Sequence, residues 1–165
     1  MIYKSLVLVP AILLLLSGCK KNERNPVGNG PLHISGESYF SFAAEDTIID
    51  CSSDSIWASY DNVARNTTVN SYRKGDSRSM EIIVPGNSEG SWSSTKVTAI
   101  IFYWPRLEGD LEYSSNSRSS IDIAITKYGN VGDWVTGTFS GTLYSPANQD
   151  SIIISNGKFN VKRLF

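Results

Sequence analysis

The part of the chain that restricts the fold most narrowly lies near the C-terminus and reads IIISNGKFNV over residues 152–161. Three isoleucines precede Asn156-Gly157, and Phe159 and Val161 follow at alternate positions. Asn and Gly tolerate the positive φ angles of a type I′ turn, and alternating apolar side chains are typical of strands with one buried face. The stretch therefore predicts a tight C-terminal β-hairpin with its turn at Asn156-Gly157.

The same two-residue period extends upstream. Ile121, Ile123 and Ile125 alternate with polar or small residues, whereas residues 99–104 are apolar without alternation, as in a central strand covered on both faces. No stretch of ten or more residues after residue 32 shows helical spacing. The candidate strands are residues 32–42, 55–60, 67–73, 79–84, 96–104, 120–128, 134–144, 151–155 and 158–163. About eight or nine short strands without helices predict an antiparallel β-sandwich, or alternatively a closed β-barrel.

The composition agrees with this fold class and restricts the partners. Ser, Asn, Gly and Thr make up over a third of the chain, which is typical of turns and strands rather than helices. The 15 Lys and Arg residues nearly balance the 16 Asp and Glu residues, so the formal net charge is -1. A chain so balanced has no general attraction for a phosphate backbone, and we therefore expect no nucleic-acid partner.

The N-terminus carries the pattern of an exported lipoprotein. Lys4 precedes an apolar run over residues 6–16, which is shorter than the ~20 residues that cross a bilayer and suits a signal peptide. Directly after it, LSGC at residues 16–19 resembles a bacterial lipobox. The resemblance implies cleavage before Cys19, a diacylglyceryl group on its thiol and acylation, for example by palmitate, of the new N-terminus. The alternative is an ordinary secretory peptide in which Cys19 has no role.

These features divide the chain into three parts. Residues 1–18 form the predicted signal peptide, residues 19–31 a lipidated and flexible tether, and residues 32–165 a single all-β domain. Lys20 follows the cysteine where an Asp would favour retention in the inner membrane, which by resemblance to gram-negative lipoproteins implies anchoring in the outer membrane. Whether the domain faces the periplasm or the cell exterior stays open.

Three segments between residues 120 and 161 add a family resemblance. They read SIDIAITKY at residues 120–128, VTGTFSGTL at 135–143 and ISNGKFNV at 154–161. Together they resemble the C-terminal pattern of small all-β lipoproteins of unknown function from gram-negative bacteria. Gly137 and Gly141 share a face with Phe139, so we expect them to make room around that ring or to permit a bend. The resemblance implies an all-β lipoprotein and brings no activity with it, because its residues are packing residues.

Few residues suggest catalysis. His33 is the single histidine and lies beside the tether, whereas triads and zinc sites usually rely on histidine. Cys51 lies close to Asp50 and Asp54, whose negative charges oppose formation of a thiolate, so a partly buried thiol fits better than a nucleophile. The sequence therefore predicts a non-enzymatic protein with no catalytic residue, no metal ligand set and no cofactor.

Carboxylates offer an alternative to this view. Glu108, Asp110 and Glu112 follow Pro105 in a turn that contains glycine, and further acids lie over residues 45–54. Two carboxylates across a cleft hydrolyse glycosides, and six to eight oxygens bind Ca²⁺, although neither group has the spacing of a calcium loop. We retain the three acids of the turn as speculative ligand-binding residues, with a glycan hydrolase as the less favoured function and bound calcium as an open question.

Trp92 is the tryptophan with the least to pack against locally. It lies among small polar residues in a predicted loop over residues 89–94. The favoured interpretation is a ring that tucks back under the sheet, and the alternative is a stacking platform for a sugar ring. Trp57, out of phase with Ile56, is expected to face solvent or a second sheet.

Three tripeptides resemble a glycosylation acceptor. Asp-Thr-Ile at residues 46–48 and Asp-Ser-Ile at 54–56 and 150–152 match the pattern Asp-Ser/Thr-aliphatic, at which some gram-negative bacteria O-glycosylate exported proteins. The resemblance implies Thr47, Ser55 and Ser151 as speculative acceptors, which we expect at exposed strand starts.

The sequence as a whole predicts an outer-membrane lipoprotein whose domain binds a ligand of the envelope, either a glycan or a protein, and whose lipid contacts the membrane. The alternatives are a passive structural or accessory lipoprotein and, less favoured, a hydrolase.

Overall fold

The computed structural model describes residues 37–51, 55–75, 77–93, 95, 98–105, 111–147 and 150–165. The chain divides into two units, Met1–Ile34 and Ser35–Phe165, and all described residues belong to the second. Within these ranges there is no helix that could span a membrane. Cys19 and His33 lie outside the described residues.

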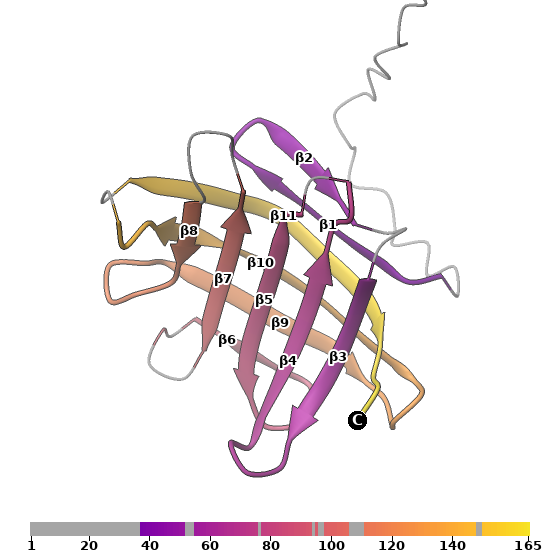
Figure 1. Ribbon diagram of the computed structural model, residues 1–165. Helices are drawn as coiled ribbons and strands as arrows, with labels where there is room; N and C mark the ends of the chain where they lie inside the picture. The colour runs from indigo at the N-terminus through magenta and orange to yellow at the C-terminus, as the bar shows by residue number, and fades with distance from the viewer. Residues whose placement is uncertain are drawn as a thin grey trace, which may run out of the picture. The chain divides into compact units, whose positions relative to one another are not determined.

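The described part of the domain consists of eleven strands (Figure 1). They form one sheet in the order β2-β1-β11-β10-β8-β7-β5-β4-β3, with β9 paired to β10 and β6 paired to β9. All these strand pairs are antiparallel, which confirms the all-β class predicted from the sequence. In chain order the strands are β1 (Tyr39–Ala44), β2 (Thr47–Asp50), β3 (Ser55–Asp61), β4 (Asn66–Tyr72), β5 (Ser79–Pro85), β6 (Gly90–Trp92), β7 (Ala99–Trp104), β8 (Leu111–Ser114), β9 (Ile121–Tyr128), β10 (Trp134–Tyr144) and β11 (Ser151–Lys162).

The sheet curls into a half-barrel with two layers. Strands β3, β4, β5 and β7 form the front layer, and β9, β10 and β11 cross behind them together with β1, β2 and β6, which we call the back layer (Figure 1). At one side β8 pairs with β7 and also bridges to β10. At the other side the residues after β11 bond to β3: the Leu164 N–H donates to the Ala58 carbonyl at 2.9 Å, and the Tyr60 N–H donates to the Phe165 carbonyl at 2.8 Å. The arrangement thus combines features of the sandwich and of the barrel that the sequence left open.

The C-terminal hairpin consists of β10 and β11, but its turn does not lie at Asn156-Gly157. Strand β11 continues through both residues, although Asn156 has the positive φ of 53° that favours a turn. Both halves of β11 pair with the same two neighbours, and the register against β10 and β1 shifts at this point. The predicted type I′ turn is therefore wrong. The two residues form a β-bulge, because β1 and β10 extend past them on both sides.

Phenylalanine rings connect the two layers inside the core. The ring centroids of Phe42 of β1 and Phe102 of β7 lie 5.4 Å apart, and this contact joins the two layers. Within the back layer, the ring centroids of Phe40 and Phe139 lie 5.3 Å apart. Large apolar rings in edge and offset contact add to the stabilisation from their burial. The core therefore rests on aromatic contacts between strands far apart in the sequence.

Two glycines make these ring positions possible. Gly137 of β10 pairs with Phe159 of β11, and Phe139 pairs with Gly157. A Cβ atom at Gly137 would overlap the Phe159 ring and the Ala124 carbonyl oxygen. Each glycine thus makes room for a ring on the neighbouring strand, whereas the sequence suggested room around Phe139 on the same strand.

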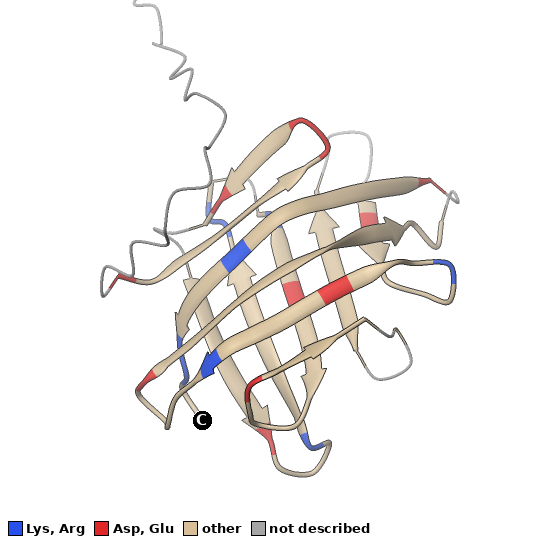
Figure 2. Cartoon of the chain, turned by 180° about the vertical axis from the view of Figure 1, so that it is seen from behind, with Lys and Arg blue, Asp and Glu red and all other residues tan. Residues whose placement is uncertain are grey.

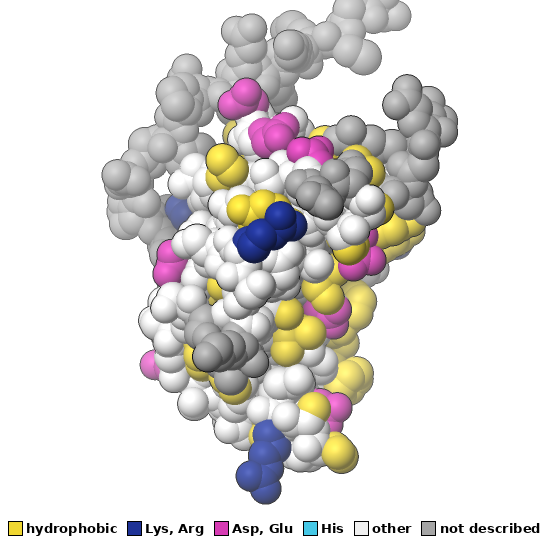
Figure 3. All heavy atoms as spheres, turned by 90° about the vertical axis from the view of Figure 1, so that its left-hand side faces the viewer, with side chains coloured by type: hydrophobic (Ala, Val, Ile, Leu, Met, Phe, Trp, Pro, Cys, Tyr) yellow, Lys and Arg dark blue, Asp and Glu magenta, His cyan; other side chains and the backbone are white. Residues whose placement is uncertain are grey.

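The outer faces of the two layers differ. Figure 2 shows the back layer toward the viewer with few charged positions along its strands, and the outward residues of β9 and β10 there include Asp122, Ala124 and Thr138. The front layer instead turns large side chains outward, such as Trp57 and Ile101. Hydrophobic side chains run down the right-hand margin of Figure 3, which is the front-layer side.

Glu37, just before β1, contacts one end of the back layer's outer face. The Thr136 hydroxyl donates to Asn160 Oδ1 at 2.7 Å, and Asn160 Nδ2 donates to the Glu37 carbonyl at 3.2 Å. Tyr39 lies opposite Asn160, and its buried hydroxyl has no hydrogen-bond partner among the described residues. Burial raises the pKa of Tyr39 above its ordinary value.

Candidate functional site

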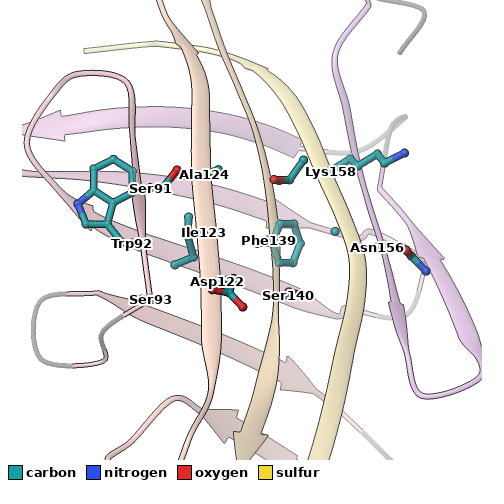
Figure 4. A pocket seen from close by; sticks show the side chains of 12 residues that line it. Ser91, Trp92, Ser93, Asp122, Ile123, Ala124, Phe139, Ser140, Asn156 and Lys158 are labelled. Atoms are coloured by element: carbon teal, nitrogen blue, oxygen red, sulfur yellow. The ribbon is translucent and has the colours of Figure 1, made fainter. Parts of the chain in front are cut away.

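A hollow of about 500 Å³ lies on the outer face of the back layer, where β6, β9, β10 and β11 run side by side (Figure 4). Its middle is lined by small side chains, and larger polar groups surround them. The polar residues that line it are Ser91, Ser93, Asp122, Thr138, Ser140, Asn156 and Lys158. The hollow therefore gathers several hydrogen-bonding side chains from four strands in one concavity.

The strand register brings these residues together. Ser91 of β6 pairs with Ala124 of β9, Ala124 pairs with Thr138 of β10, and Thr138 pairs with Lys158 of β11. Three interstrand spacings of about 4.8 Å give this row a span of about 14 Å. Small side chains at Ala124 and Thr138 keep the floor low, so the longer Lys158 rises at one end. The concave shape thus follows from the sizes of side chains in one cross-strand row.

The chemistry of the lining is hydrogen bonding rather than metal binding. Hydroxyls both donate and accept, the Asp122 carboxylate accepts, the Lys158 ammonium donates, and the Asn156 amide does both. Across the part of the chain that the structure describes, no three His, Cys, Asp or Glu side chains gather as metal ligands would. The hollow can therefore hold a polar ligand by many directional bonds.

Trp92 lies on strand β6 and not in the predicted loop. It pairs with Ile123, whose side chain is buried, so the Trp92 ring lies on the core side of the sheet, opposite to Ser91. The ring is half-buried, packs against the core and lies 2.9 Å from where a Cβ of Gly90 would be. Figure 4 shows it beside β6 at one end of the hollow. Core packing, the favoured interpretation from the sequence, describes this geometry better than a stacking platform.

Glu112, the described residue of the three predicted acids, does not line the hollow. Glu112 lies on β8, exposed and paired with Tyr103 of β7, so it faces outward on the front-layer side. Glu108 and Asp110 lie outside the described residues. The structure therefore does not bring Glu112 and Trp92 to one site.

The three acceptor-like residues occupy equivalent places in the fold. Thr47, Ser55 and Ser151 are the first residues of β2, β3 and β11, and each is exposed. This is the placement expected from the sequence, and their glycosylation stays a prediction.

The polar residues of the hollow were not selected from the sequence. Asp122, Thr138 and Ser140 alternate with buried residues, so their outward position was readable, but nothing local shows that β9, β10 and β11 are adjacent in this register. No family model, curated protein or solved structure matches the chain. The geometry and chemistry of the described surface are therefore the basis for inferring a function.

Proposed function

We propose that this chain is a lipid-anchored outer-membrane protein whose β domain binds a polar ligand of the envelope, a glycan or a protein, without chemical turnover. The observation that carries the proposal is the group of hydroxyl side chains in the lining of the hollow, which lie beside Asp122, Asn156 and Lys158. Such a concavity with several convergent polar groups is the usual setting of a ligand site.

The anchoring part of the proposal is supported by the N-terminal sequence. LSGC at residues 16–19 matches a lipobox in all four positions, and residues 20–31 are polar enough to serve as a tether. The resemblance of the C-terminal segments to small all-β lipoproteins agrees with this. Acylation at Cys19 would hold the domain at the membrane surface, where ligands of the envelope are concentrated.

The chemistry of the lining favours binding over hydrolysis. A glycosidase needs two carboxyl groups on opposite sides of the scissile bond, and Asp122 is the single carboxylate among the described residues that line the hollow. Hydrogen bonds to hydroxyl and amide groups hold a ligand without transferring protons. The second candidate, a passive accessory lipoprotein, would leave this polar concavity without a ligand.

The binding proposal is tested with two probes of the envelope, soluble muropeptides from peptidoglycan and deacylated lipopolysaccharide, measured by isothermal titration calorimetry. Thr138→Leu places an apolar side chain in the middle of the row. We expect it to weaken binding of the recognised probe about tenfold, which corresponds to about 1.4 kcal/mol, because it removes a hydroxyl and fills the floor.

Thr142→Leu is the matched control, since Thr142 lies on β10 outside the lining and faces the same side. We expect it to bind as the unmodified protein does. If neither probe binds the unmodified protein, or if both variants weaken binding equally, the accessory role becomes the better explanation.

A further inference from the structure

The outer face of the front layer carries aromatic rings on three strands. Trp57 of β3 lies in a row with Asn70, Glu81 and Ile101. The next row along the strands contains Tyr72, Ser79 and Tyr103. Because residues two apart in a strand point to the same side, Trp57, Tyr72 and Tyr103 all project from this face.

These side chains surround a second hollow of about 320 Å³. Tyr72 is 40% exposed, and its hydroxyl donates to Ser77 Oγ at 3.3 Å. Figure 3 shows yellow hydrophobic and magenta acidic side chains alternating down the margin that corresponds to this layer. The surface is thus an open mixture of rings and polar groups.

The fold does not require aromatic residues at these outward positions. The core under this layer is supplied by the inward residues Ala58, Val69, Ile82 and Phe102, which are 0 to 1% exposed. Large rings on an outer face leave apolar area in contact with water, and clustered apolar area on a soluble surface usually marks an interaction site. The position of the rings therefore points to a ligand.

A sugar chain fits this face better than a protein partner does. The C–H hydrogens on the face of a pyranose ring are slightly positive and stack on the negative face of an aromatic ring, and its hydroxyls bond to neighbouring amides and carboxylates. Asn70 and Glu81 supply such groups between Trp57 and Tyr103. Protein interfaces, in contrast, are depleted of charged residues at their centre, where Glu81 lies here.

The dimensions and charge narrow the ligand class further. The distance from β3 to β7 covers three interstrand spacings, about 14 Å, so the face can contact more than one ring of a chain. No Lys or Arg lines this second hollow within the described residues, and Glu81 would repel an anionic polymer. We propose that this face binds a neutral polysaccharide of pyranose sugars. This surface is separate from the hollow on the back layer, and neither proposal depends on the other.

The experiment is affinity electrophoresis of the purified protein in native gels that contain xylan, laminarin, mannan or dextran as neutral polymers, or alginate as an anionic one. We expect at least one neutral polymer to retard the protein and alginate not to do so. Trp57→Ala and Tyr103→Ala should each weaken the apparent affinity about tenfold, and Trp57→Phe should retain most of it because a ring is kept.

Two controls locate the effect. Trp134→Ala removes a half-exposed tryptophan of β10 that lies outside both hollows, and Thr138→Leu alters the back-layer hollow. Both should be retarded like the unmodified protein, and circular dichroism shows whether each variant is folded. The proposal is overturned if no neutral polymer causes retardation, if the Trp57 and Tyr103 variants migrate like the unmodified protein, or if alginate retards it equally. None of these results bears on muropeptide or lipopolysaccharide binding at the other hollow.

Discussion

The front and back layers bury similar side chains but are built differently. In the back layer, β10 and β11 are 11 and 12 residues long and place Gly137 and Gly157 opposite phenylalanines. In the front layer, β3, β4, β5 and β7 are six or seven residues long and contain no glycine. The back layer therefore packs phenylalanine rings inward over glycines, whereas the front layer turns Trp57, Tyr72 and Tyr103 outward.

This difference explains the two outer faces. Where phenylalanine rings fill the inside of the back layer, the outward residues of β9 and β10 at the hollow are small or polar, and they leave a concave, hydrogen-bonding surface. In the front layer aliphatic side chains supply much of the core, and Trp57, Tyr72 and Tyr103 are available on the outside. One sheet thus presents two surfaces with different ligand chemistry.

We expect the largest loss of stability when an added side-chain atom fills the space beneath an inward ring. Gly137→Ala adds a Cβ that would overlap the Phe159 ring and the Ala124 carbonyl oxygen. Overpacking of this kind costs about 1–3 kcal/mol, and we expect the upper end because one of the clashing atoms belongs to the backbone. Urea denaturation measures the change in the free energy of unfolding.

Gly75→Ala is the control for this variant, since nothing lies within 4 Å of the added Cβ there. We expect it to change the free energy of unfolding by less than about 1 kcal/mol. Equal changes in the free energy of unfolding for the two variants would contradict the idea that packing of the Phe159 ring requires glycine at position 137.

A smaller effect separates the two tryptophans. Trp92→Ala removes a ring that packs against the core, so we expect a loss of about 2 kcal/mol, less than for a fully buried tryptophan. Trp57→Ala removes an outward ring of the front layer, so we expect a loss below about 1 kcal/mol. Thermal melting gives the decrease in melting temperature for each variant. A larger decrease for Trp57→Ala than for Trp92→Ala would show that the outward rings stabilise the fold.

The smallest effect concerns the end of the back layer that Glu37 contacts. Within the part of the chain that the structure describes, the buried Tyr39 hydroxyl has no hydrogen-bond partner, so Tyr39→Phe should leave stability unchanged or raise it by up to about 1 kcal/mol at neutral pH.

Burial also gives Tyr39 a pH dependence. Because the folded state raises the pKa of Tyr39, its contribution to stability is fully present below the ordinary pKa of about 10 and is lost as the pH rises through the higher folded value. The free energy of unfolding, measured by urea denaturation at increasing alkaline pH, should therefore decrease less with pH for Tyr39→Phe than for the unmodified protein. An equal decrease for the two proteins would count against a buried phenol.

The candidate site was only partly predictable. The alternation around Ile121 and Ile123 identified the outward residues of β9, and the phase of Trp57 relative to Ile56 allowed for its outward position. The short strands β2, β6 and β8, of three or four residues, were missed because so few positions show no period. The sequence consequently predicts a loop at Trp92, although pairing with β9 holds this residue in a strand.

The sequence by itself determined the all-β class, most strand positions and which residues of each strand face the core, because alternation is a local property of the chain. Only the tertiary structure decided that Asn156-Gly157 is a bulge, because the left-handed backbone at Asn156 suits a bulge as well as a turn and the partner strands β1 and β10 make the choice. It also decided which outward residues are neighbours, since Ser91, Ala124, Thr138 and Lys158 meet through hydrogen-bonded register between distant segments. Both candidate ligand surfaces arise from that register, which no local pattern records.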